Sequence, residues 1–466
     1  MTKTTIQEPF RYPEELRPGF IETPDLLFRD DTRVTTEEIW NYMTKEAPKR
    51  YPYAFNASGN YVGRLSEDVH FLSGIKRGYL SISFYDRLTE AKKKGVPIVY
   101  NQGGQTWEPY FAAGGIGTHP VYLGQWALNK KEGLSFREAS SRQDTIREEA
   151  RKRLSVEICN DAAYGAIQRG EIEVDLIAPY LCLRCSDVAY GVEAHRHGEV
   201  KTPLFLVDYP VDHQKDKEWS VDFFRKTLIR LVEKVSALSG KETTEEDLRN
   251  EIKLHNKVRE VTRDYVHSWW SAKTPPTNSV DHSNIISLGN EMYGDPVATK
   301  QVAEESLKET KERIKKSVKG AGLKDDPARL FICGSCVSPN TTFVDKVGGV
   351  VVGKDDQWSE IYTHVKETGD PYENLARAVL SFPYELPTED RGHWIAEQAK
   401  KSRADGVIFM YQWGCNYQTA VARMINDVVK DELGIPTVNI EIAELGRMEA
   451  LEQSENRVEA FIEMLR

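Results

Sequence analysis

The stretch FICGSCVSP, at residues 331–339, decides how this chain is interpreted, because two cysteines stand at C-x-x-C spacing where a short apolar run ends. The run RLFICG (329–334) predicts a buried strand, since it is apolar and closed by a glycine. A second pair, in LCLRC at 181–185, follows the apolar run VDLIAPYL at 174–181. Ligands of open parallel sheets bind beyond the carboxyl ends of the strands, so both pairs lie where a binding site is expected.

The cysteines as a group follow this pattern, with one weaker member. Six are present: Cys159, Cys182, Cys185, Cys333, Cys336 and Cys415. Cys415 comes after the apolar run DGVIFMY (405–411), so five of the six thiols lie at the binding edge of a predicted sheet. Cys159 falls in a predicted helix and depends on the fold to reach the others. In a reducing compartment C-x-x-C spacing is typical of metal or redox chemistry, so we expect the thiols to be ligands.

Strands and helices alternate in two parts of the chain, and long helices separate these parts. The first part has predicted strands at 96–101, 174–181 and 203–209 and predicted helices at 35–43, 84–95 and 136–171. The second has predicted strands at 329–334, 347–353, 405–411 and 435–441 and predicted helices at 390–403 and 416–433. Between them, residues 216–318 show helical periodicity only. The predicted fold class is therefore α/β, with two Rossmann-like parallel-sheet domains and a helical segment between them.

The domain boundaries follow from these changes of pattern. They are 1–50 for an N-terminal arm, 51–212 for the first α/β domain, 213–325 for the helical segment and 326–466 for the second α/β domain. At 466 residues the chain is long enough for two or three domains.

Composition excludes two classes of partner. The chain has 62 Lys and Arg against 72 Asp and Glu, a net charge of −10, so no basic excess favours nucleic acid. No run approaches the roughly 20 apolar residues of a membrane helix, and the N-terminal sequence lacks the apolar core of a signal peptide. We expect no membrane association and a cytoplasmic location.

Two other motifs carry competing interpretations. GGVVVGKD (348–355) resembles part of a Walker A loop, but Asp355 replaces the Ser or Thr that would hold magnesium, so it predicts a strand and its turn. FAAGGIG (111–117) predicts a turn after a helix. His195 and His197 are interpreted as a solvated helix end, with a proton-donor role as the sharper alternative.

Three metal sites suit the thiols taken alone. A zinc ion would use the two C-x-x-C pairs, one [4Fe-4S] cluster would use three or four cysteines, and two cubanes would use all six with three thiolates each.

Ordered motifs along the chain resemble one enzyme family. These are CNDAAYG (159–165), DLIAPYLC (175–182), SGKETTEEDLRN (239–250) with HNKVR (255–259), and ADGVIFMYQWGC (404–415). From about residue 80 to the end they resemble the 2-hydroxyacyl-CoA dehydratase and benzoyl-CoA reductase family. Ordinary members hold one cubane on three cysteines, so the six thiols resemble its double-cubane branch.

The resemblance implies a function. It implies an anaerobic iron–sulfur oxidoreductase, with an [8Fe-9S] double-cubane cluster at the domain interface, held by all six cysteines. It further implies a small or hard-to-reduce substrate, a homodimer, and a separate dimeric activator ATPase that carries its own [4Fe-4S] cluster. The alternative is a 2-hydroxyacyl-CoA dehydratase-type subunit with a single [4Fe-4S] cluster.

The partition of the thiols between two cubanes has two possible forms. Chain locality groups Cys159 with the 181–185 pair, and Cys415 with Cys333 and Cys336. The single-cubane relatives instead take ligands from both halves. Chain locality is favoured, because three ligands from one rigid domain lose less conformational entropy on binding than ligands shared between two domains.

Overall fold

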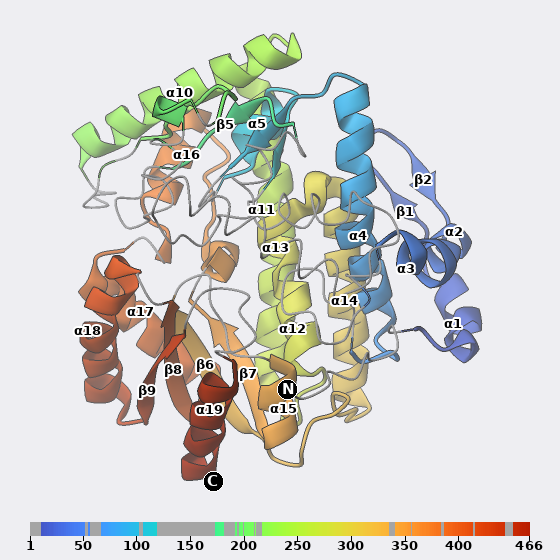
Figure 1. The fold of residues 1–466 in the computed structure, drawn as a ribbon, viewed down its shortest axis with the longest axis vertical. Helices are drawn as coiled ribbons and strands as arrows, with labels where there is room; N and C mark the ends of the chain where they lie inside the picture. Colours follow the sequence, from blue (N-terminus) through green and yellow to red (C-terminus); the bar gives the residue numbers. More distant parts are fainter. Residues whose placement is uncertain are drawn as a thin grey trace.

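The computed structural model describes most of the chain outside a central block (Figure 1). The described residues are 11–51, 55, 67–101, 106–118, 173–180, 192, 195–198, 200–208, 210, 217–334, 341–355, 357–383, 386–412, 415–442 and 451–466. Their strands form one small hairpin and two parallel sheets, so the predicted α/β class with parallel sheets is confirmed.

The N-terminal segment packs beside the helices as short elements. They are η1 (Glu14–Leu16), α1 (Arg17–Ile21), β1 (Leu26–Leu27), β2 (Arg33–Val34), α2 (Thr36–Asn41), the π-helix η2 (Tyr42–Glu46) and α3 (Ala47–Arg50). β1 and β2 pair antiparallel. Thr35 caps α2 by accepting from the backbone NH of Glu38, whose carboxylate accepts from the NH of Thr35. This capping box confirms the predicted helix start.

The first parallel sheet has the strand order β4-β3-β5. Its elements are α4 (Leu72–Lys93), β3 (Ile98–Tyr100), α5 (Glu108–Ala112), β4 (Ile116–Thr118) and β5 (Leu176–Ile177). Single parallel bridges join Ile177 to Leu204 and Tyr180 to Val207, where the strand at 203–209 is predicted. The turn after α5 is confirmed, whereas the strand that follows it was not predicted. The helix predicted at 136–171 lies outside the described residues.

Five helices and one 3-10 turn fill the segment between the sheets, and the prediction of helices without strands there is confirmed. They are α10 (Glu218–Ser239), α11 (Glu245–Ser271), α12 (Ser279–Ile286), α13 (Leu288–Glu291), η3 (Met292–Gly294) and α14 (Pro296–Lys315). Gly240, at φ +73°, ends α10 in the left-handed conformation. Thr244 caps α11 through the backbone NH of Asp247. The long helices α4, α11 and α14 stand side by side in Figure 1.

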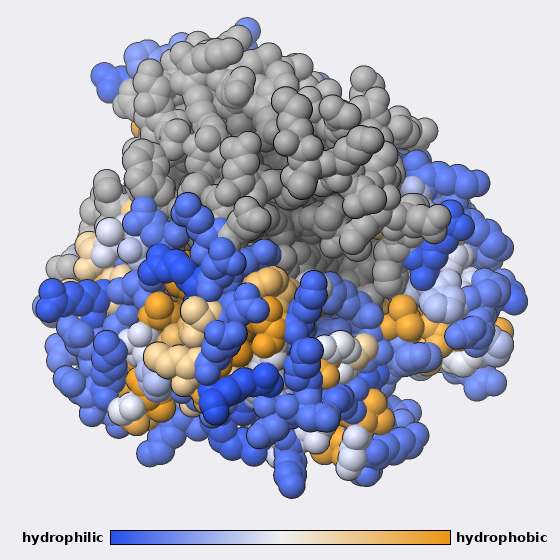
Figure 2. All heavy atoms as spheres, turned by 60° about the horizontal axis from the view of Figure 1, so that its bottom comes forward, coloured by the Kyte–Doolittle hydropathy of each residue, from blue (hydrophilic) through white to orange (hydrophobic). Residues whose placement is uncertain are grey.

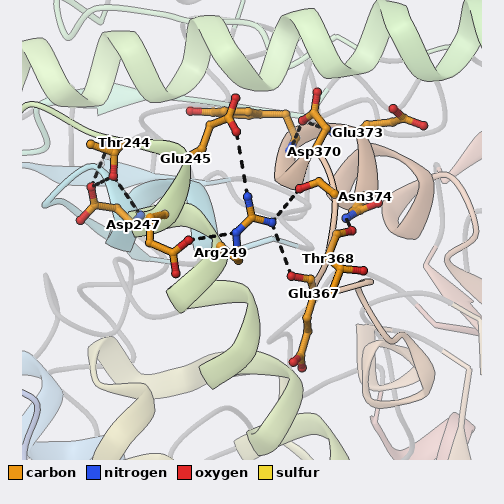
Figure 3. Close-up of polar contacts among 12 residues, drawn as sticks. Thr244, Glu245, Asp247, Arg249, Glu367, Thr368, Asp370, Glu373 and Asn374 are labelled. Atoms are coloured by element: carbon orange, nitrogen blue, oxygen red, sulfur yellow. Dashed lines mark hydrogen bonds and ion pairs between the residues drawn. The ribbon is translucent and has the colours of Figure 1, made fainter.

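The start of α11 is tied to a later segment of the chain (Figure 3). Arg249 donates to the carbonyl oxygens of Gly369 at 2.6 Å and Glu367 at 3.4 Å. Directly after them Asp370 caps α16 (Pro371–Val379), and its carboxylate accepts from the NH of Tyr372 at 2.9 Å. α16 then packs against α10 and α11, so the C-terminal part of the chain reaches across to the helical segment.

The second parallel sheet has the order β7-β6-β8-β9. Its strands are β6 (Ala328–Gly334), β7 (Gly349–Lys354), β8 (Gly406–Gln412) and β9 (Thr437–Ile442), so all four predicted strands are confirmed. The accompanying helices are α15 (Thr341–Val347), the 3-10 helix η4 (Gln357–Tyr362), α16, α17 (Thr388–Lys401), α18 (Asn416–Leu433) and α19 (Leu451–Leu465). The Walker-like stretch is β7, which confirms its prediction as a strand.

Side chains from the helical segment cover β7, an edge strand of this sheet. The carbonyl oxygen of Val352 accepts from Trp270 Nε1 at 2.7 Å and from His282 Nε2 at 3.2 Å. The NH of Val351 donates to Ser279 Oγ at 2.8 Å. The second sheet is thus hydrogen-bonded to α11 and α12 through its edge.

The surface at the second sheet's end of the molecule is largely polar. Figure 2 brings this end forward and shows mainly hydrophilic residues, with separate hydrophobic groups between them. Among the described helices, none combines the length and the apolar character that crossing a membrane requires.

Candidate functional site

Two of the predicted ligands belong to the described residues, and they lie at the ends of neighbouring strands. Cys333 lies near the end of β6, is 1% exposed, and pairs in register with Phe409 of β8. Cys415 stands half-buried just beyond β8, at the N-cap position directly before α18. The other four cysteines lie outside the described residues. Sequence reasoning therefore places these two thiols correctly at one edge of one sheet.

The topology makes that edge the expected ligand site of the sheet. From β6 the chain moves to β7 on one side, and the next strand to join, β8, lies on the other side of β6. At such a reversal the connections diverge and leave a crevice at the carboxyl ends of the two strands. Cys333 and Cys415 flank this position. The edge strands β7 and β9 contribute no cysteine.

A buried ion pair lies at the same edge. Asp355 directly follows β7, and Arg391 projects from the first turn of α17; both side chains are 0% exposed. Arg391 Nε and Nη2 each lie 2.7 Å from Asp355 Oδ2. Burial raises the pKa of Asp355 above its ordinary value, and Arg391 opposes part of this rise. Sequence reasoning missed the pair.

Gly334, the residue after Cys333, is held by both members of this pair. Its NH donates to Asp355 Oδ1 at 3.0 Å, and its carbonyl oxygen accepts from Arg391 Nη2 at 2.8 Å. Gly334 has φ +133°, and a Cβ atom there would lie 1.8 Å from the carbonyl oxygen of Met410 in β8. Only glycine fits, because the chain leaves β6 in direct contact with the neighbouring strand.

The position of Cys415 favours an ionised thiol. Its side chain makes no capping hydrogen bond, while its carbonyl oxygen accepts from the NH of Thr419 at 3.1 Å and from Thr419 Oγ1 at 2.9 Å. The thiol thus stands at the positive end of an 18-residue helix. A helix N-terminus stabilises a thiolate, the form in which cysteine binds metals.

The first sheet presents its carboxyl edge without a described thiol. Asn101 directly follows β3 and Thr118 ends β4, and the NH of Asn101 donates to the carbonyl oxygen of Thr118 at 3.0 Å. The described part of the neighbouring strand region ends at Tyr180, so the predicted ligands Cys182 and Cys185 fall just beyond it. In the described ranges no three His, Cys, Asp or Glu side chains gather as a metal would require.

The two histidines singled out by the sequence lie on a helical turn that Gly198 ends at φ +73°. His197 is exposed, as the interpretation as a solvated helix end predicts, whereas His195 is half-buried. The proton-donor alternative remains a prediction.

The fold and the site together define an α/β protein with cysteines at the switch point of a parallel sheet. The chain belongs to the family described as 2-hydroxyglutaryl-CoA dehydratase, D-component, whose model matches residues 116–465. This confirms the family resemblance seen in the sequence motifs.

Three curated relatives are similar to the chain at low identity. One benzoyl-CoA reductase subunit of Thauera aromatica is 26% identical over 53% of this chain and 64% of its own length. Putative dehydratase subunit YjiM of Escherichia coli is 23% identical over 81% of this chain and 93% of its own length. The (R)-phenyllactyl-CoA dehydratase beta subunit of Clostridium sporogenes is 24% identical over 56% and 68%. The chain thus covers less than two thirds of the length of the first of these relatives. All three names denote dehydratase or reductase subunits.

Proposed function

We propose that the chain is an iron–sulfur enzyme that reduces small or hard-to-reduce molecules with low-potential electrons. In this proposal Cys159, Cys182, Cys185, Cys333, Cys336 and Cys415 hold an [8Fe-9S] double-cubane cluster at the interface of the two α/β domains. The observation that carries it is the position of Cys333 and Cys415, which lie at the carboxyl ends of adjacent strands at the switch point of the second sheet. The reductase among the relatives supports the same kind of chemistry.

The described residues fit such a group. Thiolates are the ligands that iron–sulfur clusters require, and the edge offers one thiol on a buried strand end and one at a helix N-terminus. When bound, the cluster supplies one-electron chemistry at low potential. The buried strand end excludes water from Cys333, and α18 stabilises the charge of Cys415. Both effects belong to the protein and would act on any metal held there.

The partners in this proposal are a dimeric activator ATPase with its own [4Fe-4S] cluster, a small-molecule substrate and a second copy of the chain. The division of labour with an ATPase is supported by β7, since the only Walker-like stretch singled out in the sequence is a strand. Its Lys354 is 9% exposed within that strand. A phosphate loop needs a concave run of backbone NH groups, which an extended strand does not provide.

A second candidate is a dehydratase-type subunit with a single [4Fe-4S] cluster. The names of the two dehydratase relatives favour it. In that case three of the six cysteines are structural, and Cys333 and Cys336 are the pair that ordinary relatives do not need.

Iron and sulfide analysis of anaerobically purified protein separates the candidates. We expect about eight irons per chain for the double cubane, about four for the single cluster and none for a zinc site. Replacement of Cys333 and Cys336 by Ser sharpens the test. The double-cubane proposal predicts a large loss of iron in this variant, whereas an unchanged iron content at about four per chain would establish the single-cluster alternative.

A further inference from the structure

The Asp355–Arg391 pair has an arrangement that stability alone does not explain. Both side chains are 0% exposed, so two charges have been removed from water. A buried ion pair often contributes less than apolar side chains of the same size, because desolvation offsets the attraction. In some proteins such pairs are retained because they fix one geometry, and the contacts of this pair show which geometry it could fix.

The pair holds Gly334, the residue that follows the predicted ligand Cys333. Three peptide bonds connect Cys333 to Cys336. The first is bound through the NH of Gly334, which donates to Asp355, and the second through the carbonyl oxygen of Gly334, which accepts from Arg391. Two charge-assisted hydrogen bonds thus set the direction in which the chain leaves β6.

The same arginine contacts the segment that carries the third thiol. Arg391 Nη1 donates to Gln418 Oε1 at 3.4 Å, and Gln418 is 1% exposed in the first turn of α18, the helix that follows Cys415. The guanidinium carbon also lies 5.8 Å from the ring centroid of Phe409, the register partner of Cys333. One side chain therefore touches both thiol-bearing segments.

We propose that Asp355 and Arg391 are positioning residues that fix the end of β6 at Gly334 against the start of α18, so that Cys333 and Cys415 meet one metal cluster in a single geometry. This inference rests on the proposed function, because it requires the thiols to bind iron. Residues that orient metal ligands change metal affinity by about 10- to 100-fold when they are replaced.

The test compares Arg391→Lys with a matched variant at another buried ion pair. Lysine keeps the charge but loses the planar fork that serves Asp355 and Gly334 together. The control is Arg259→Lys, since Arg259 and Glu108 form an ion pair at 2.8 Å with side chains 5% and 0% exposed, joining α11 to α5. Both variants are purified anaerobically, and their thermal midpoints are measured beside those of the parent.

Iron release to bathophenanthroline disulfonate and the electron paramagnetic resonance spectrum of the reduced protein are the readouts. We expect Arg391→Lys to release iron about 10-fold faster or more and to change the spectrum, while Arg259→Lys changes only the thermal midpoint. If Arg391→Lys does not fold, the double variant Asp355→Leu, Arg391→Met removes both charges and serves in its place. It is expected to show the same faster release.

Two results overturn the inference, and they are distinct. If the parent protein contains iron and the folded Arg391→Lys variant has the same release rate and spectrum, the pair is purely structural. Parent protein without iron overturns the proposed function and this inference with it.

Discussion

Replacement of Gly334 by alanine tests how the chain leaves β6. The new methyl group would lie 1.8 Å from the carbonyl oxygen of Met410, and this oxygen belongs to backbone in the middle of the sheet. This carbonyl oxygen cannot move out of the way as the end of a flexible side chain could. The backbone at φ +133° is also one that residues other than glycine rarely adopt.

The expected loss of stability follows from these two effects. A residue held in a sparsely populated backbone region costs about 1–3 kcal/mol. Insertion of a methyl group where there is no space costs a further 1–3 kcal/mol or so. The sum is about 2–6 kcal/mol. Gly434→Ala is the matched control, because Gly434 has φ +66° at the end of α18 but open space around its Cβ position, so only about 1–2 kcal/mol is lost.

Urea denaturation followed by far-ultraviolet circular dichroism measures the difference. We expect the midpoint of Gly334→Ala to fall further than that of Gly434→Ala, by an amount equivalent to at least about 1 kcal/mol. The iron content of Gly334→Ala should also fall, since the end of β6 that carries Cys333 must move. Equal or smaller destabilisation than in the control would refute the close contact between β6 and β8.

The remaining predictions concern a buried histidine, ATP turnover and the partition of the thiols. Burial lowers the pKa of His282 to about 3, from the ordinary histidine pKa of 6.5. Below pH 6.5 the unfolded state therefore binds a proton that the folded state does not, and at pH 5.5 this lowers the free energy of unfolding by about 1.4 kcal/mol. The variant His282→Gln should not show this loss, as denaturation at the two pH values would measure. The purified chain alone should hydrolyse no ATP, and turnover that Lys354→Ala abolishes would contradict this. Cys415→Ala should damage the cubane that carries Cys333 and Cys336 and leave the other intact by spectroscopy; a structure with Cys415 and Cys159 on one cubane would instead establish the cross-domain arrangement.

The predicted strands of the second sheet are confirmed because each is an apolar run long enough to show its pattern. β4 escaped prediction since its three residues, Ile116–Thr118, follow two glycines and carry no pattern; pairing with β3 alone makes them a strand. The first half of α4 escaped for another reason. Lys76 and Arg77 are buried there, and their partners Glu305 and Tyr293 lie more than 200 residues away in sequence. Charged residues on the inward face hid the helical periodicity.

The positions of Cys333 and Cys415 at the sheet edge were predictable from the sequence, whereas the side chains that contact their segments were not. A cysteine after an apolar strand is a local signal, whereas the pairing of Asp355 with Arg391 depends on how α17 packs. Asp355 does stand directly after an apolar strand, and a buried charge at that place requires an oppositely charged or hydrogen-bonding partner. The start of α16 carried a clearer signal, because Asp370 followed by Pro371 is a typical N-cap with proline in the first turn.

The hydrogen bonds that cover β7 also determine how the second sheet can grow. An exposed edge strand offers its backbone to any other extended chain, which is how sheets aggregate or recruit partner strands. At β7 the carbonyl oxygen of Val352 is taken by Trp270 and His282, and the NH of Val351 by Ser279. A strand from another molecule would first have to displace α11 and α12. The contacts with α11 and α12 therefore oppose growth of this sheet by strand addition at its β7 edge.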